Sequence, residues 1–313
     1  MTPIWTVDKD DRLTTFFALL GLSIDTHRRI VAGERSRIRQ SEETITETIL
    51  LELSISLPNL RISTHSRRKE SRSGADWEWW IEGNTRWFGM LVQAKKLHAA
   101  RGHPNGGYGF GYAPQSASGE LQVDRLIYTA EHRASPTLAP IYVLYNGTDK
   151  TTSQVQCPFR TLDQHELAGG ITAMSAYTVR ALAEKNISPR RRYQDVPLEQ
   201  VSPHAIPWSC LATCGTSCET GYGGHGTPPL WDDAQFKEYD PASRAAAAVN
   251  MLIAQFPRSD ERPNDIPPEA RLHAEPPSYV PPTMDRWSDA EPPTSQLASH
   301  MAVLYRNRRN TNQ

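Results

Sequence analysis

The sequence lacks three features: a long hydrophobic run, a strong net charge and a large set of cysteines. The longest apolar stretch near the start, residues 16–22, is far shorter than the ~20 residues of a membrane-spanning helix. The first residues carry no basic segment followed by an apolar one, as a secretory leader would. Only four of 313 residues are cysteines, so a disulfide framework is not expected. We therefore expect a cytoplasmic protein with no membrane partner.

The formal net charge of −1 argues against a protein that coats nucleic acid with its whole surface. Any contact with nucleic acid must come from a local basic patch. Hydrophobic residues make up 38% and charged residues 22%, which permits one packed core with additions. We expect a helical segment over 1–40 and a core with an extension over 41–220. Residues 221–313 are expected to form a proline-rich appendage with one helix and a candidate terminal strand.

Hydrophobic periodicity predicts a fold that contains both helices and strands, of the α/β (α+β) class. Apolar residues at helical spacing predict helices over 11–34, 41–56, 121–132, 171–185 and 242–256. Strand-like runs occupy 60–64, 76–81, 87–95, 139–146 and 300–306. Residues 101–119 are rich in glycine, proline and serine and are expected to form a mobile loop.

The strongest local prediction is a hairpin in which Asp76 lies opposite Gln93. This register places the turn between Asn84 and Thr85, in the centre of a polar loop. Alternate residues of a strand point to the same face, so Asp76, Gln93 and Lys95 would project together. A shift by one residue would bury Gln93 and Lys95, so the apolar pattern itself favours this register.

These polar groups suit a hard divalent cation, which prefers oxygen ligands. Asp76 offers a carboxylate, Gln93 an amide oxygen and Ala94 a main-chain carbonyl. Lys95 would lie beside the attacking water and would stabilise negative charge in the transition state of phosphodiester hydrolysis. The helix over 41–56 could bring Glu43 or Glu47 to the same place, and Glu43 lies near the edge of its apolar stripe.

The element order and these motifs resemble the PD-(D/E)XK (restriction endonuclease-like) nuclease superfamily. The order is a helix with a glutamate, then Gly74-Ala75-Asp76, a hairpin, and Gln93-Ala94-Lys95. Glutamine before x-Lys is similar to the variant of Mrr-type restriction enzymes. The helix after the hairpin and the strand over 139–146 match the superfamily's αβββαβ core, so the resemblance implies a central mixed sheet flanked by helices. The stretches Gly-Ala-Asp-Trp-Glu-Trp-Trp and Val-Gln-Ala-Lys-Lys-Leu look like an uncharacterised bacterial family.

The resemblance implies that Asp76 and Gln93 are metal ligands, with Mg2+ or Mn2+ as the cofactor. Lys95 would be the catalytic lysine, and the helix glutamate would fall on Glu43 or, failing that, on Glu47. Gln93 replaces an acidic residue, so cation affinity should fall and the helix glutamate should matter more.

Two other groups of residues leave alternatives open. Glu78 shares the face of Asp76 and is a candidate extra ligand, although a structural role is favoured. A zinc site could also be imagined at four residues, although buried or reduced thiols are favoured because the spacing is not the usual Cys-x2-Cys knuckle. These residues are His204, Cys210, Cys214 and Cys218.

Two functions follow from this pattern. The first is a metal-dependent nuclease in bacterial defence against foreign DNA, with DNA favoured over RNA as the substrate. The second is a catalytically inactive module on the same fold that binds nucleic acid or protein. Gln93 and the absence of basic charge favour the second function, whereas Lys95 favours the first, because a buried lysine without a partner is costly. A homodimer is compatible with either.

Overall fold

The computed structural model describes residues 11–64, 73–100, 103–111, 121–147, 169–187, 194–213, 240–254, 267–286 and 300–305. The helices are α1 (Asp11–Arg35), α2 (Glu42–Ser56), α4 (Gln122–Tyr128), α5 (Ala176–Lys185), α6 (Leu198–Val201), α7 (Cys210–Thr213) and α9 (Pro241–Ala254). A π-helical turn over Thr129–Arg133 extends α4. The strands are β1 (Leu60–Thr64), β2 (Trp77–Glu82), β3 (Trp87–Lys96), β4 (His98–Ala100), β5 (His103–Tyr108), β6 (Ala139–Tyr145), β7 (Ile171–Ser175), β8 (Val196–Pro197), β9 (Ile206–Pro207) and β10 (His300–Leu304).

Seven strands form one mixed sheet in the order β1-β10-β2-β3-β6-β7-β9. β2 and β3 are antiparallel, and β3 and β6 are parallel. Within this sheet, the chain order from α2 to β6 is helix, three strands, helix, strand, while β4 and β5, which lie between β3 and α4, belong to a second sheet. The predicted fold class, a central mixed sheet flanked by helices, is confirmed.

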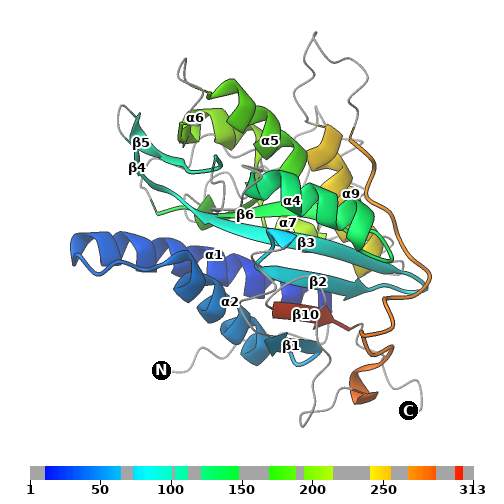
Figure 1. Cartoon of the computed structure of the whole chain (residues 1–313). Coiled ribbons are helices and arrows are strands. Elements are labelled where there is room, and N and C mark those ends of the chain that lie inside the picture. Colours follow the sequence, from blue (N-terminus) through cyan, green and yellow to red (C-terminus); the bar gives the residue numbers. More distant parts are fainter. Residues whose placement is uncertain are drawn as a thin grey trace, which may run out of the picture.

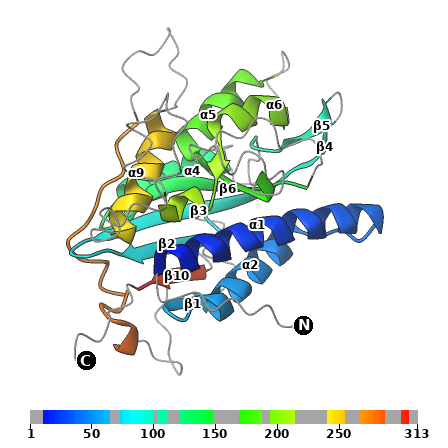
Figure 2. The same cartoon turned by 180° about the vertical axis from the view of Figure 1, so that it is seen from behind.

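Helices cover both faces of this sheet (Figures 1 and 2). α4 and α5 pack together on one face, over β3, β6 and β7. α1, α2, α7 and α9 lie on the other face, where α9 contacts β2 and β3 and α2 contacts β1 and β3. The sheet is thus enclosed in the middle, which explains why β2 and β6 are buried along their whole length, and why β6 is apolar on both faces.

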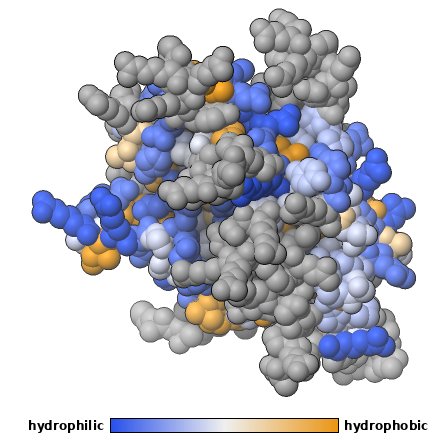
Figure 3. All heavy atoms as spheres, viewed as in Figure 1, coloured by the Kyte–Doolittle hydropathy of each residue, from blue (hydrophilic) through white to orange (hydrophobic). Residues whose placement is uncertain are grey.

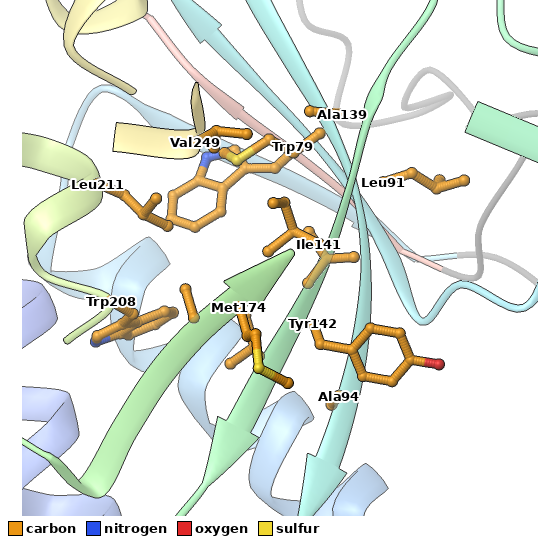
Figure 4. Close-up of a cluster of buried hydrophobic side chains, with 14 of the residues drawn as sticks. Trp79, Leu91, Ala94, Ala139, Ile141, Tyr142, Met174, Trp208, Leu211 and Val249 are labelled. Carbon is orange, nitrogen blue, oxygen red and sulfur yellow. The ribbon is translucent and has the colours of Figure 1, made fainter. Parts of the chain in front are cut away.

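The core on the α9 face is built around Trp79. Figure 4 shows its indole ring beside Val249 of α9 and Leu211 of α7. Its ring also lies 6.2 Å from that of Trp208, whose Nε1 donates to the main-chain oxygen of Leu19 in α1. The expectation that Trp77, Trp79, Val92 and Ala94 point into the core is therefore confirmed, since all four are at most 3% exposed.

The C-terminal part of the chain is not an appendage, which corrects the expected division at residue 220. β10 lies inside the sheet, antiparallel to β1 and parallel to β2. The described residues 267–286 run along the molecule as a strap, which is orange in Figure 1. The hydroxyl of Tyr279 donates to Glu78 at 2.6 Å, and His273 forms a β-bridge with Trp87.

Two local expectations were wrong. Residues 171–175, expected to be helical, form β7, and the helix begins only at Ala176. The glycine-rich stretch after residue 101 contains β5, which joins β4 and β8 in a second sheet. Gly106 has a φ of +86°, and a Cβ on Gly107 would lie 3.1 Å from both Ala100 Cβ and Val196 O. The glycines thus allow close strand packing there.

The side of the molecule in Figure 3 is mainly hydrophilic where its residues are described, with separate hydrophobic spots. Within the described ranges, none of the helices combines the length and the apolar character that crossing a bilayer requires.

Candidate active site

The segment before β2 brings Asp76 against the first turn of α4. Gly74 adopts a φ of +75°, a conformation that other residues rarely adopt. A Cβ added there would lie 2.6 Å from the main-chain oxygen of Gln122. The side chain of Ser73 accepts a hydrogen bond from the Ala75 amide at 3.2 Å and closes the turn. Glycine is therefore required for Asp76 to lie close to α4.

The hairpin has the predicted register. Trp77 pairs with Val92 and Glu82 with Trp87, which places Asp76 opposite Gln93. The Asp76 amide donates to Val92 O at 2.8 Å. Gln93 contacts Gln122 of α4, so this polar face of the hairpin is the one that α4 covers.

The Asp76 carboxylate and the Ala94 carbonyl converge on the side chain of Gln93. Gln93 Nε2 donates to Asp76 Oδ2 at 2.7 Å and to Ala94 O at 2.9 Å. The Ala94 amide also donates to Asp76 Oδ2, at 2.6 Å. Two of the three expected oxygens, Asp76 Oδ2 and Ala94 O, converge, but the Gln93 amide presents its nitrogen to them. Its oxygen Oε1 accepts from Gln122 Nε2 at 2.7 Å.

The helix carboxylate that reaches the site is Glu42. Its Oε1 lies 3.2 Å from Lys95 Nζ, and its Oε2 accepts from the Lys96 amide at 2.8 Å. Glu43 and Glu47, which the sequence analysis had favoured, are both exposed. The placement of the helix glutamate is corrected accordingly.

The physical reason for this correction is the width of the apolar stripe of α2. Thr46 is buried together with Ile49 and Leu53, and Glu42 lies one turn before Thr46 on the same line. The apolar stripe defined by Ile45, Ile49, Leu50 and Leu53 leaves out Thr46, so Glu43 lies nearer to the edge of that stripe than Glu42 does. The spacing i, i+4, i+7, i+11 from Glu42 was the available signal.

Hydrogen bonds fix the start of α2 against the sheet. Ser41 caps the helix by accepting from the Thr44 amide at 3.1 Å. Thr46 Oγ1 donates to Glu42 O at 2.9 Å and lies 2.8 Å from the Tyr145 hydroxyl of β6. The Ser41 cap and the hydrogen bonds of Thr46 fix the start of α2, so the orientation of Glu42 toward Lys95 follows from the packing of the helix.

Nearby carboxylates create a negative electrostatic potential at the two buried tyrosines of β6, Tyr142 and Tyr145. Burial raises the pKa of the Tyr142 hydroxyl well above its ordinary value, and the charges of nearby carboxylates raise it further. These carboxylates are Asp76, Glu42 and Asp124. Burial also raises the pKa of Tyr145, and the hydrogen bond with Thr46 only partly opposes this. Both phenols therefore stay neutral and add no negative charge of their own.

Two buried polar atoms near this face have no hydrogen-bond partner among the described residues: Gln122 Oε1 and the Tyr142 hydroxyl. Buried polar atoms are normally paired, so each of these two exceptions calls for a physical explanation. Sequence reasoning identified the helix that begins at Gln122 but not the role of this side chain, because only the folded chain brings it to Gln93.

The donor set fits a hard divalent cation. Asp76 Oδ2, Ala94 O and the Gln93 amide oxygen, if turned inward, are oxygen ligands of the kind that Mg2+ prefers. In the described part of the chain, no three histidine, cysteine, aspartate or glutamate residues are grouped as a metal site would require. A cation here would therefore depend on the amide and carbonyl oxygens beside a single close carboxylate.

The other candidate ligands do not join this cluster. Glu78 is fully buried and accepts from Trp80 Nε1 at 2.5 Å and from the Tyr279 hydroxyl, so its contacts are with the hydrophobic core and the strap. Of the candidate zinc residues, Cys210 is buried at the start of α7 and His204 ends a 3-10 turn. Cys214 and Cys218 lie outside the described residues.

Comparison with known proteins gives a family but no function. No curated protein and no solved structure matches the chain. One family profile, described as a family of unknown function (DUF6615), matches residues 18–311 and thus includes the site, the strap and β10. The chain therefore belongs to the family of unknown function DUF6615.

Proposed function

We propose that this protein is a Mg2+-dependent nuclease that hydrolyses phosphodiester bonds of DNA. The observation that supports the proposal is the convergence of Asp76 Oδ2 and Ala94 O on one point, with Lys95 two residues after Gln93 on β3 and bonded to Glu42. The resemblance to PD-(D/E)XK nucleases supports it further, because the elements of the central sheet and its helices from α2 to β6 follow the order that the resemblance implies, with β4 and β5 as an insertion between β3 and α4. A role in defence against foreign DNA rests on that resemblance alone.

Each residue of the site would have a separate role in hydrolysis. Asp76, Ala94 O and the amide oxygen of Gln93 would hold the cation, which supplies Lewis-acid polarisation of the phosphate when bound. Lys95 would donate hydrogen bonds to the phosphate oxygens as negative charge develops there. Glu42 accepts from Lys95 Nζ and keeps the ammonium in place before substrate arrives. Hydrolysis then forms a bond from water oxygen to phosphorus and breaks the bond to the leaving sugar oxygen, which takes up a proton.

The first test is cleavage of linear, circular and single-stranded DNA with Mg2+, Mn2+ or a chelator. Lys95→Ala should reduce cleavage about a hundredfold to a thousandfold, because a charge that acts on the developing negative charge works mainly in the transition state. DNA affinity should change little, since one lysine is roughly one phosphate contact. Lys96→Ala is the matched control: its Nζ donates to Gln40 O, so its loss should cost much less.

A second test measures the cation directly. Mg2+ should raise the melting temperature of the wild type, because a ligand that binds only the folded state stabilises it by mass action. Asp76→Ala should abolish both this increase and cleavage. If the wild type cuts no substrate with any divalent cation and is not stabilised by one, the nuclease proposal is wrong.

The second candidate function is a binding module on the same fold without catalysis. The observation that favours it is the Gln93 side chain, whose nitrogen already satisfies both Asp76 Oδ2 and Ala94 O. A module of this kind would need Lys95 for partner binding only. The Lys95→Ala variant separates the two functions. In a binding module it would weaken partner binding, and the wild type itself would show no cleavage.

A further inference from the structure

The amides of Gln93 and Gln122 are arranged as a pair with an unused acceptor. Gln122 Nε2 donates to Gln93 Oε1 at 2.7 Å, and Gln93 Nε2 donates to Asp76 and Ala94. Gln122 Oε1 is buried and has no hydrogen-bond partner among the described residues. The pair therefore satisfies Gln93 completely but leaves Gln122 with one buried acceptor unpaired.

This arrangement is incompatible with a cation at the same oxygens. A divalent ion would lie roughly 2.0–2.6 Å from its oxygen ligands. Gln93 Nε2 already lies 2.7 Å from Asp76 Oδ2 and 2.9 Å from Ala94 O, and its hydrogens carry partial positive charge. The amide group and the ion would compete for one position, so binding of a cation requires Gln93 to move its nitrogen away.

We propose that Gln93 and Gln122 form a paired amide switch that reverses when a divalent cation binds, an inference that rests on the proposed function. Rotation of the Gln93 amide by half a turn points Oε1 at the cation and Nε2 at Gln122. Rotation of the Gln122 amide then brings its unpaired Oε1 to accept from Gln93 Nε2. One hydrogen bond between the two amides is exchanged for another: Gln122 Oε1 gains a donor, and Gln122 Nε2 takes its place as the buried group without a partner in the pair.

Such a reversal is physically easy because both groups are amides. The oxygen and nitrogen of an amide are similar in size, and rotation about the last side-chain bond has a broad energy profile. The main chain of Gln122 is held beside Gly74 at the start of α4, so the two side chains stay in contact in both states. Gln122 is thus a positioning residue that acts on the site through Gln93.

The switch also explains how the site keeps its geometry without a cation. In the described state, the Gln93 amide nitrogen bonds to both oxygens that an ion would bridge. The site is therefore preorganised, and cation affinity is reduced by the free energy that reversing the pair requires.

The test uses the full chain with isotope-labelled glutamine side chains, observed by NMR with and without Mg2+. Without Mg2+, the side-chain amide protons of Gln93 should show a nuclear Overhauser contact with the Ala94 amide proton, since both groups bond to Asp76 Oδ2. Saturating Mg2+ should remove this contact. Mg2+ binding is measured separately by calorimetry, with Asp76→Ala as the variant that does not bind. The Gln93→Glu variant has no side-chain amide protons at residue 93, so the signal that disappears from its spectrum is assigned to Gln93.

A variant of Gln122 shifts the switch without a cation. Gln122→Glu offers only acceptors, so it cannot donate to Gln93 Oε1 and favours the reversed state. In this variant, the side-chain amide protons of Gln93 should show no Overhauser contact with the Ala94 amide proton even in chelator. Mg2+ should then change the Gln93 signal little. Gln122→Met, which has neither donor nor acceptor, should leave the contact in place in chelator.

The outcomes separate the switch from the nuclease proposal. If Mg2+ binds to the wild type and the contact between Gln93 and Ala94 persists, the switch is wrong and the nuclease proposal stands. If calorimetry detects no Mg2+ binding to the wild type, both are wrong. If the contact is lost on binding and is already absent in Gln122→Glu, the switch is supported.

Discussion

A single glycine sets the distance between the metal-binding candidate Asp76 and the helix that covers it. Gly74→Ala introduces a Cβ at a φ of +75°, 2.6 Å from Gln122 O. We expect a loss of about 1–3 kcal/mol in the free energy of unfolding, because strained backbone and a clash act together. Cleavage should fall as well, since Asp76 and Gln122 would move apart. The measurement is the midpoint of urea unfolding together with the cleavage rate.

Gly21→Ala is the matched control for this substitution. Gly21 is exposed in α1, and a Cβ there would meet nothing within 4 Å. The alanine should therefore stabilise the protein by about 0.5–1 kcal/mol through the helix propensity of the residue. Equal effects of the two substitutions would show that the environment of Gly74 has no special importance.

The second feature at the scale of single residues is that position 93 carries an uncharged amide and not a carboxylate. Gln93→Glu removes the donor to Asp76 and places two carboxylates in contact. In chelator, the variant should melt at a lower temperature than the wild type, because like charges repel at short range. Mg2+ should raise its melting temperature more than that of the wild type, since the second carboxylate is a stronger ligand. An unchanged Mg2+ response would contradict the assignment of Gln93 to the cation site.

Sequence reasoning found Asp76, Gln93 and Lys95 because strand alternation fixes which residues share a face. It did not find the partner of Lys95, because the apolar stripe of α2 was defined without Thr46, although the helical spacing of Glu42 from Thr46, Ile49 and Leu53 contained the information. The role of Gln122 has no sequence signal, because it depends on the orientation of two amides in the folded chain.

At the scale of elements, Asp240 links the turn of the β2–β3 hairpin to the start of α9. Its Oδ1 accepts from the Asn84 amide at 2.7 Å and its Oδ2 from the Ser243 amide at 3.3 Å. Asp240→Ala should lower the free energy of unfolding by about 1–2 kcal/mol, because it removes a helix cap. Asp240→Asn retains an acceptor oxygen and should cost much less. Chemical unfolding of both variants checks the prediction, and equal losses would argue against capping.

The elements that sequence reasoning predicted well are those whose periodicity is strong. The hairpin of β2 and β3, the strand β6 and the helices α1 and α2 were found close to their observed bounds. β7 was missed because Ile-Thr-Ala-Met-Ser runs directly into a helical pattern, and only pairing with β6 makes it a strand. β5 was missed because glycine and proline usually mark loops.

At the scale of the whole molecule, the C-terminal strand β10 lies between two strands from the first third of the chain. β10 separates β1 from β2 and buries Met301 and Val303. Deletion of residues 300–313 should therefore abolish cooperative unfolding and make the protein sensitive to protease, because it leaves two strand edges unpaired. Circular dichroism and limited proteolysis measure both effects.

Deletion of residues 307–313 is the control for this truncation. It keeps β10 and Tyr305, whose amide donates to Asn59 O at 3.0 Å and whose ring packs against Trp87. This shorter deletion should leave the unfolding midpoint nearly unchanged. If the longer deletion unfolds with the same midpoint and cooperativity, β10 is dispensable for the sheet.

The position of β10 also has a consequence for protein synthesis. The ribosome makes β2, with the site beside it, more than two hundred residues before β10. At a translation rate of about 5–20 residues per second, the nascent chain holds β2 with one open edge for on the order of ten seconds or longer. Under the proposed function, an activity that could damage the DNA of the cell would thus be assembled only after β10, which completes the sheet, has left the ribosome. Incomplete translation products would carry Asp76, Gln93 and Lys95 without the framework that holds them together.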